Sequence, residues 1–459
     1  MLSALLRKKS IQNPHQDSQL IRSLNAFDLV LFGIGAIIGA GVFVLTGIAA
    51  ATKAGPAIVI SYTVSGFAAF FAALAYAELA ASVGGTGSAY SYAYAGFGEL
   101  FAWIIGWDLL LEYIMSVSTV AIGWSGYVDN LFEAIHIHLP SALTKNPFDG
   151  GVVNLLAISI IVALSGLLII GVKQSARFNA FIVFIKLITI GVFIIAAIPH
   201  VNLSYWRDFT PFGWTGIMQG AALVFFAYIG FDALSTAVEE TTNPERNVPI
   251  GILLSLIICT LIYIIVSALL TTIVPYTTLN VRSPVADALL RIGQKGAAGF
   301  IAAGAIAGLT TVMLVMYYGL TRICLAISRD GLIPRFIGTI NPRTRTPIRI
   351  IILTGFLMSI ISGFAPIERA AELVNIGTLA AFVFVCIGVI SFRLTHPDLP
   401  RPFKSPFSPL IPLCGVLFCL YLMINLPIVT WWRFIIWMII GLFIYFLYGY
   451  RHSMLKQKN

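Results

Sequence analysis

Long apolar runs repeat along almost the whole chain, and short polar connections separate them. An α-helix needs about 20 apolar residues to cross the roughly 30 Å hydrocarbon core of a membrane. The chain offers twelve such runs, at residues 27–52, 55–81, 97–126, 152–172, 176–199, 214–238, 248–275, 296–321, 347–365, 369–392, 407–429 and 431–450. In lipid the backbone must satisfy its own hydrogen bonds, and runs this long exclude barrel strands. The pattern predicts an all-α integral membrane protein with twelve transmembrane helices.

Two of these runs are interrupted. The first contains the stretch GIGAIIGAGVF at residues 33–43, and glycine in a helix interior costs about 1 kcal/mol relative to alanine. The sixth contains AALVFFAYIGFDALS at 221–235, where Gly230 and Asp232 disturb an apolar sequence. Paired broken helices at matching positions of two halves are typical of transporter binding sites. Close helix packing is the alternative use of such glycines.

A broken helix suits one kind of ligand in particular. N–H groups at the start of a half-helix favour a carboxylate, and free carbonyl groups favour an ammonium group. Glycine allows a ligand to approach the backbone closely. The two breaks therefore predict a site for a zwitterion near the middle of the membrane.

The composition agrees with a membrane protein, because 59% of the residues are hydrophobic and 10% are charged, whereas soluble proteins carry about 25% charged residues. The net charge of +9 first suggests a nucleic-acid partner. With a cytoplasmic N-terminus and twelve crossings, however, nineteen of the 28 lysines and arginines lie on the cytoplasmic side and eight outside. This is the positive-inside pattern. It predicts a multi-pass protein of the cell membrane, surrounded by lipid, with both termini cytoplasmic and no nucleic-acid partner.

Ionisable side chains inside a span cost roughly 2.5–3.5 kcal/mol and are candidates for function. They are Glu78, Asp108, Glu112, Lys186 and Asp232, with Glu372 nearer an end. Asp108 and Glu112 share one helix face with Ser116 and Thr119. That face is predicted to line either a binding pocket or a helix–helix seam.

The sequence contains no sign of an enzyme. There is no Ser/His/Asp set, Walker loop or HExxH motif, and all six histidines lie in loops or tails. We therefore expect no catalytic residues, no metal site and no cofactor. A membrane sensor would need a signalling domain, and the polar connections are too short to form one.

Three longer motifs carry a resemblance to a known family. They are GIGAIIGAGVF, AYAELAASVGGTGSAYSYAY at 75–94 and FFAYIGFDALSTAVEETTNPERNVPIGI at 225–252. The chain resembles the amino acid–polyamine–organocation transporters over nearly its whole length. EETTNPERNVPIGI and SRDGLIPRF are most similar to the cationic amino acid transporter branch, and the count of twelve spans resembles its bacterial members.

The resemblance implies a LeuT-like inverted repeat of five plus five helices, with the first and sixth helices broken. The expected segments are a cytoplasmic N-terminus (1–26), a first repeat (27–199), a second repeat (214–392), two additional helices (407–450) and a cytoplasmic tail (451–459). Secondary transport of amino acids is the implied activity.

The family's substrate site falls on residues of the two breaks. The carboxylate site corresponds to Gly39, Ala40 and Gly41. The ammonium site corresponds to the carbonyl groups of Ile37, Phe226, Ala227 and Ile229, and Phe226 also matches an aromatic gate. Many relatives have serine at the position of Ala40, so carboxylate binding here has to rely on the backbone.

Lys186 is the candidate for proton coupling, because it is the only lysine or arginine deep in a predicted span. Burial disfavours a charged amine, so a buried lysine can bind and release protons. In the implied fold the fifth helix runs beside the broken first helix, where an ammonium group would donate to free carbonyls near Gly33, Ile34 or Ile37, with Thr310 or Thr311 as a further partner. The alternative is a permanently charged lysine paired with an acid.

The sequence thus predicts a proton symporter that imports L-amino acids, with cationic or broad selectivity, by alternating access. Glu112 and Ser116 are the candidates for side-chain specificity. An amino-acid exchanger without proton coupling is the alternative, and a partnership with a small membrane subunit stays open.

Overall fold

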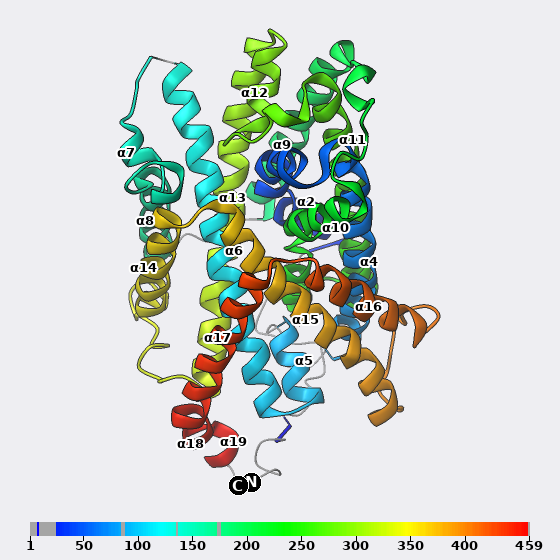
Figure 1. Ribbon diagram of the computed structural model, residues 1–459. Coiled ribbons are helices and arrows are strands. Elements are labelled where there is room, and N and C mark those ends of the chain that lie inside the picture. The colour runs from blue at the N-terminus through cyan, green and yellow to red at the C-terminus, as the bar shows by residue number, and fades with distance from the viewer. Residues whose placement is uncertain (1–6, 9–23, 84–87, 135, 172–175, 458–459) are drawn as a thin grey trace.

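The computed structural model describes residues 7–8, 24–83, 88–134, 136–171 and 176–457 (Figure 1). The described residues are mostly helical, and their β-structure is one isolated bridge between Leu24 and Thr241. By length and composition, eight helical segments of this part are long and apolar enough to cross a membrane, and four shorter apolar helices accompany them. The predicted all-helical class is confirmed. Most of the predicted N-terminal segment 1–26 lies outside the described residues.

The helices of the first predicted repeat begin with α2 and end with α9. They are α2 (Ala26–Ile37), η1 (Gly41–Leu45), α3 (Thr46–Ala49), η2 (Ala50–Ala54), η3 (Gly55–Ala57), α4 (Ile58–Ser82), α5 (Ser88–Gly96), α6 (Glu99–Ala134), α7 (Ser141–Thr144), η4 (Pro147–Asp149), α8 (Leu155–Ile170) and α9 (Ala176–Ala197). Two 3₁₀ turns follow, η5 (Ile198–His200) and η6 (Leu203–Trp206).

The second predicted repeat runs from α10 to α15. Its helices are α10 (Gly213–Val224), η7 (Phe225–Tyr228), η8 (Phe231–Glu240), α11 (Pro244–Ile273), η9 (Tyr276–Thr278), α12 (Pro284–Arg291), α13 (Lys295–Arg329), α14 (Ile348–Phe364) and α15 (Ile367–Thr395). The remaining helices are α16 (Leu410–Ile424), α17 (Ile428–Ile444), η10 (Tyr445–Gly449), α18 (Tyr450–His452) and α19 (Met454–Gln457).

The first apolar run is broken at the predicted place. A capping box starts α2, because the Asn25 side chain accepts from the N–H groups of Phe27 and Asp28. The last helical hydrogen bond runs from Ile38 N to Ile34 O (2.9 Å), and Ile38 then adopts an extended conformation. The chain becomes helical again in the π-helix η1. The break therefore leaves backbone groups without helical partners on both sides of it.

The sixth run is broken as well. After α10 the chain forms the short 3₁₀ turn η7, passes through an extended Ile229 and reaches Gly230 at φ +116°. A Cβ at Gly230 would lie 2.8 Å from the carbonyl oxygen of Ala36 in the other break. Only glycine combines this conformation with so close an approach. The two breaks therefore touch each other in the centre of the molecule.

The broken helices are enclosed by the long helices around them. α11 packs against α2 and α4, while α13 packs against α6 and α9. Figure 1 shows α6 and α13 along the middle of the molecule, with α8 and α14 together at one side. The aromatic core includes fully buried tyrosines on α4 and α11, among them Tyr62 and Tyr263. This packing fixes the positions of both breaks.

A cluster around Glu78 joins three segments at the predicted cytoplasmic end. The Glu78 carboxylate on α4 accepts from Arg393 Nε (2.8 Å) and Nη2 (2.7 Å) at the end of α15. It also accepts from Ser405 N (2.8 Å), and Arg401 Nε lies 3.9 Å away. One buried carboxylate thus fastens α4, α15 and the loop before α16 to one another.

Candidate functional site: two broken helices and a buried lysine

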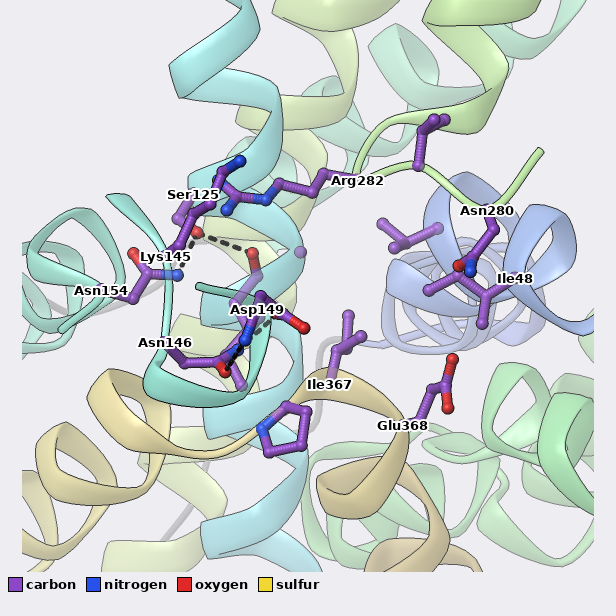
Figure 2. A pocket seen from close by; sticks show the side chains of 15 residues that line it. Ile48, Ser125, Lys145, Asn146, Asp149, Asn154, Asn280, Arg282, Ile367 and Glu368 are labelled. Carbon is purple, nitrogen blue, oxygen red and sulfur yellow. Dashed lines mark hydrogen bonds between the residues drawn. The ribbon is translucent and has the colours of Figure 1, made fainter. Parts of the chain in front are cut away.

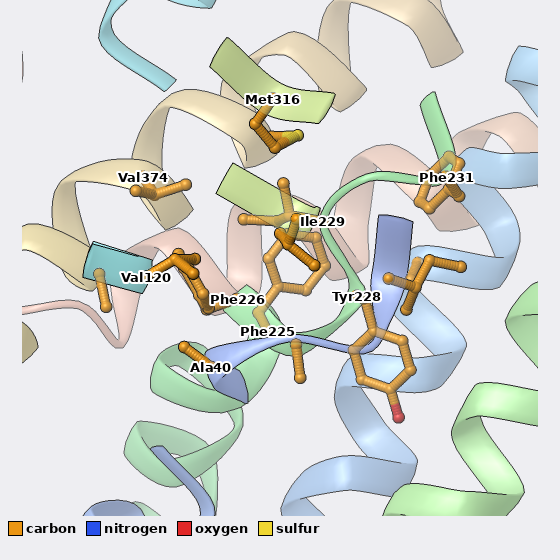
Figure 3. Close-up of a cluster of buried hydrophobic side chains, with 14 of the residues drawn as sticks. Ala40, Val120, Phe225, Phe226, Tyr228, Ile229, Phe231, Met316 and Val374 are labelled. Atoms are coloured by element: carbon orange, nitrogen blue, oxygen red, sulfur yellow. The ribbon is translucent and has the colours of Figure 1, made fainter. Parts of the chain in front are cut away.

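A cavity of about 20 Å³ lies between the two breaks. Its lining comprises Ala36, Ile37, Gly39, Ala40, Gly41, Ser116, Val120, Phe226, Ile229, Val312 and Met316. Figure 3 shows five of these side chains in the surrounding apolar cluster, those of Ala40, Val120, Phe226, Ile229 and Met316. Six of the seven predicted substrate-binding residues are in the lining, and Ala227 is outside it. The volume suffices for about one water molecule. The structure is therefore a closed conformation, in which an amino acid would need an opening of the site.

The predicted carboxylate end lies at the start of η1. Gly39, Ala40 and Gly41 precede or begin this helix, so their N–H groups belong to an unpaired first turn that favours an anion. Gly41 has a second role, because a Cβ there would overlap the Cα and Cβ of Ala227. At Gly41, close packing of the two breaks is thus a reason for glycine in its own right.

The predicted ammonium end is already partly hydrogen-bonded. The Tyr263 hydroxyl on α11 lies 3.0 Å from Ile37 O and 2.8 Å from Ala227 O, which belong to different breaks. Phe226 O accepts from Ile229 N at 3.3 Å. A carbonyl oxygen has two lone pairs, so each of these groups keeps acceptor capacity. Nothing in the sequence distinguished Tyr263 from the other tyrosines of apolar runs.

Lys186 projects from α9 onto the first break. It is fully buried, and its Nζ donates to Gly35 O (2.7 Å) and to Ile38 O (3.0 Å). The sequence prediction had placed the acceptors near Gly33, Ile34 or Ile37. The observed acceptors, Gly35 O and Ile38 O, each lie one residue beyond Ile34 and Ile37. The reason is that Ile34 O still accepts a helical bond, so Gly35 has the first carbonyl that the break leaves unpaired.

The two threonines suggested as further partners do not bind Lys186. Thr310 Oγ1 donates to Ile306 O and lies 3.0 Å from Trp124 Nε1, and Thr311 Oγ1 donates to Gly308 O. The stem of Lys186 instead packs against Gly308. Within the described part of the chain, no carboxylate forms an ion pair with this lysine.

The tenth run provides a counterpart to Lys186. Asn375 on α15 is fully buried, and its Nδ2 donates to Ala222 O (2.7 Å) and to Leu223 O (2.9 Å). These are carbonyl groups at the end of α10, immediately before the second break. At each break, therefore, one side chain donates hydrogen bonds to backbone carbonyl groups. Lys186 of the fifth run binds the break in the first run, and Asn375 of the tenth run binds the break in the sixth run. The sequence prediction missed Asn375, because an uncharged amide in a span draws no attention.

The polar face of α6 points into the bundle. Asp108, Glu112, Ser116 and Thr119 are all buried. Ser116 lines the central cavity, whereas Glu112 lies beyond it, beside Asp108 and Asp232. Tyr113 donates to Asp232 Oδ2 at 3.4 Å. Since the described residues provide these three carboxyl groups with no cationic partner, they cannot all be charged at the same time.

A second, larger cavity of about 330 Å³ lies on the predicted external side (Figure 2). Its residues come from η1, α3, α6, the 145–154 connection, the loop before α12 and the start of α15. Arg282 donates from Nη1 to Asp129 Oδ2 (3.1 Å) and to Thr144 O (2.9 Å). Burial lowers the pKa of Arg282, and the Asp129 carboxylate opposes this change. No sequence motif signals this cavity, because its residues are scattered from Val44 to Glu368.

The described architecture is that of a membrane transporter, with two interrupted helices around a central site. A family model described as amino acid permease matches residues 24–445. The chain therefore belongs to the amino acid permease family, within the amino acid–polyamine–organocation superfamily.

Three relatives show how the chain stands within this family. It is 46% identical to a methylthioribose transporter of Bacillus subtilis, over 99% of the chain and 100% of the relative. It is 47% identical to the branched-chain amino acid permease BcaP of the same organism, over the full length of both. Identity to a vacuolar cationic amino acid transporter 4 of Arabidopsis thaliana is 35%, over 86% of the chain and 68% of the relative.

Proposed function

We propose that this protein is a secondary active transporter that imports aliphatic L-amino acids together with protons. It works by alternating access around the central cavity, in a cell membrane that it crosses twelve times. Residues 27–199 and 214–392 form two five-helix repeats of inverted topology. The single observation that carries the proposal is the cavity enclosed by the backbone of two broken helices.

The cavity lining supports a zwitterion with an apolar side chain. Gly39, Ala40 and Gly41 offer N–H groups for a carboxylate. The carbonyl groups of Ile37 in the first break and of Phe226 and Ile229 in the second would accept hydrogen bonds from an ammonium group. The remaining surface is apolar, from Val120, Val312 and Met316. Phe226 closes the site as a gate. Leucine, isoleucine and valine fit this lining better than arginine or lysine.

The comparison with relatives supports the same substrate class, since one relative at 47% identity is named a branched-chain amino acid permease. Another at 46% is named a methylthioribose transporter, so methylthioribose is the competing substrate to test. Glu112 lies outside the cavity lining, which supports a lesser role for this acid with neutral substrates.

Lys186 is the proposed proton-coupling residue. A fully buried amine without a paired acid is costly to keep charged. Protonated, it donates to Gly35 O and Ile38 O and ties α9 to the first break. Deprotonated, it keeps two N–H donors but loses the charge that strengthens both hydrogen bonds, and the tie weakens. The proton thereby biases an equilibrium between two conformations. An exchanger that cycles without protons is the alternative.

Uptake into proteoliposomes tests the proposal. Purified protein should accumulate labelled leucine when the outside is made acidic, and excess valine or isoleucine should compete. Arginine and methylthioribose should compete at least tenfold more weakly, since one buried mismatch costs about 1.4 kcal/mol or more. Accumulation of methylthioribose but not leucine would refute the amino-acid substrate. Leucine uptake that depends only on leucine inside the vesicle would favour the exchanger.

The orientation has a separate test. Single cysteines at positions 8 and 456, in a background without other cysteines, should react with an impermeant maleimide in inverted vesicles and not in intact cells. Reaction of either position from outside intact cells would contradict cytoplasmic termini.

A further inference from the structure

The connection between α13 and α14 is strongly positive. Residues 322–349 contain six arginines and one acid, Asp330, and they include neither lysine nor glutamate. The arginines are Arg322, Arg329, Arg335, Arg343, Arg345 and Arg349, and all six are exposed. The Asp330 carboxylate accepts from the Tyr90 hydroxyl at 2.7 Å. The stretch therefore presents far more positive charge to its surroundings than it can neutralise from within.

The positive-inside rule explains an excess of charge on the predicted cytoplasmic side, but not a fixed arrangement of that charge. Here the turn that carries two of the arginines is well fastened. Asn341 Oδ1 accepts from Arg343 N at 2.9 Å, and Asn341 N donates to Thr346 O at 3.0 Å. Thr346 Oγ1 donates in turn to Ile169 O at the end of α8, at 3.1 Å. The turn is thus bonded to α8 and holds Arg343 and Arg345 in exposed positions.

Arg345 adopts a backbone conformation that is unfavourable for a residue with a side chain. Its φ is +56°, in the left-handed region. Glycine adopts this conformation freely, whereas a Cβ destabilises it. Local strain of this kind is concentrated at functional positions. The turn thus has an arginine where glycine would fit its backbone better, which points to a role for the guanidinium group.

Arg349 lies where the exposed apolar face of α14 begins. Ile352, Leu353 and Phe356 follow it at spacings of three, four and seven residues, so all four share one helix face. Each of the three apolar side chains is more than half exposed, and Figure 1 shows α14 at one side of the molecule. Arg349 Nη1 donates to Phe336 O at 2.7 Å, which leaves four N–H donors of this guanidinium group available.

We propose that Arg343, Arg345 and Arg349 bind the phosphate group of an anionic phospholipid, phosphatidylglycerol, in the leaflet on the predicted cytoplasmic side. The acyl chains lie along the apolar face of α14, and the headgroup lies between this helix and the turn. Guanidinium groups match phosphate oxygens with paired hydrogen bonds. Within the described part of the chain, none of the three arginines is paired with an acid. This charge and the adjoining apolar face together fit a lipid rather than a soluble anion.

The lipid site is linked to the central cavity through α13. The Tyr317 hydroxyl on α13 donates to Ile351 O on α14 at 2.6 Å and lies 2.9 Å from Ser165 Oγ on α8. The neighbouring residue Met316 lines the central cavity. A lipid bound at the start of α14 therefore stabilises a group of three helices that forms one wall of the cavity. The binding itself does not depend on which substrate is transported.

The test measures binding of radiolabelled phosphatidylglycerol to purified full-length protein in an uncharged detergent, with phosphatidylcholine as the reference lipid. Phosphatidylglycerol should bind in preference. Arg343→Gln combined with Arg345→Gln should weaken its binding about thirtyfold, or about fivefold for each arginine. Arg246→Gln combined with Lys404→Gln is the matched control. It removes the same charge from exposed residues of α11 and of the loop before α16, and should leave binding unchanged.

Arg345→Gly separates lipid binding from folding. Because glycine relieves the backbone strain, the melting temperature without lipid should not fall, while the affinity for phosphatidylglycerol should fall about fivefold. Arg343→Lys keeps the charge and should lose less affinity than Arg343→Gln. Unchanged affinity in Arg345→Gly would show that this side chain does not bind lipid, and loss of affinity only together with a lower melting temperature would identify a structural residue.

Three results would overturn the lipid site. They are equal binding of the two lipids, equal weakening by the control pair, and displacement of the lipid by soluble glycerol phosphate at equal concentration. The last result would assign the arginines to a soluble phosphate compound. Because none of these measurements uses leucine, failure of lipid binding leaves the proposed transport intact, and failure of leucine uptake leaves the lipid site intact.

Discussion

The two broken helices are held by different side chains, although the geometry is similar. At the first break, Lys186 from α9 donates to the carbonyl groups of Gly35 and Ile38. At the second, Asn375 from α15 donates to those of Ala222 and Leu223. Both side chains are fully buried and donate to carbonyl groups at the interrupted ends of the helices. Each half of the chain therefore provides one buried side chain that donates to the carbonyl groups at its broken helix.

The difference between the two side chains concerns protons. An amide keeps the same two N–H donors at any physiological pH, whereas an amine gains or loses a proton and a charge. The hydrogen bonds at the second break therefore do not depend on protonation. In the proposed mechanism only the first break would respond to a proton, and this difference would couple transport to proton movement.

Replacement of Lys186 should have the largest effect. Lys186→Ala should abolish leucine accumulation driven by a pH gradient, because no proton can then bind at the first break. Counterflow of labelled leucine, which needs no net proton movement, should persist and provides the control. Accumulation by the purified variant under a pH gradient alone would refute the role of Lys186.

Replacement of Lys186 by asparagine, the residue that binds the second break, tests whether protonation or hydrogen bonding matters at the first break. Lys186→Asn should also lose pH-driven accumulation, and if the shorter amide reaches one of the two carbonyl groups, its thermal stability should exceed that of Lys186→Ala. A variant that keeps pH-driven uptake would show that hydrogen bonding, and not protonation, is what matters at this position.

Removal of the amide at the second break should weaken the fold while sparing the coupling. Asn375→Ala leaves two buried carbonyl groups without this donor, at a cost of about 1–3 kcal/mol. The melting temperature in detergent should fall, and the ratio of uptake with and without a pH gradient should match the wild type. A selective loss of the pH response would mean that both breaks take part in coupling.

The Tyr263 hydroxyl connects the two breaks and should make a smaller contribution. Tyr263→Phe removes bonds to Ile37 O and Ala227 O and should cost about 1 kcal/mol of stability. Because the hydroxyl holds the breaks together, leucine KM should change more than the pH response. An unchanged KM and melting temperature would show that this link is dispensable.

Glu112→Gln should have the smallest effect on leucine. The carboxyl group lies beside Asp108 and Asp232 and outside the central lining, so loss of its charge should lower arginine uptake more than leucine uptake. Parallel measurements of labelled arginine and leucine decide this. Equal losses for both substrates would identify Glu112 as a structural acid.

The sequence predicted the elements of the site better than their contacts. Four glycines in one run, and Gly230 with Asp232 in another, located both breaks, because lipid tolerates such residues only where the backbone is otherwise satisfied. Lys186 stood out because charge is rare in a span. Which carbonyl groups accept from Lys186 depends on the exact residue at which α2 ends. The sequence does not determine a helix end to within one residue.

Other features could not be predicted from one sequence. The requirement for glycine at position 41 comes from Ala227, which is far away along the chain, so local reasoning favoured ligand access over close packing. Nothing in the sequence around Asn375 or Tyr263 indicates that these side chains bind carbonyl groups of a break, because only the fold brings them there. The external cavity is assembled from six separate segments, and each of its charges, taken alone, reads as a solvated loop residue.

The Glu78 cluster also restricts how the protein moves. To separate the predicted cytoplasmic ends of α4 and α15, the protein would have to break two bonds from Arg393 to a single buried carboxylate, which also accepts from Ser405 N in the loop before α16. Charge-assisted bonds of this kind contribute about 1.5–3 kcal/mol each, a large barrier for a cycle driven by a proton. These bonds thus hold the predicted inner ends of α4 and α15 together. In the proposed alternating-access cycle the two ends would move as one body, and an inward passage would open between other helices.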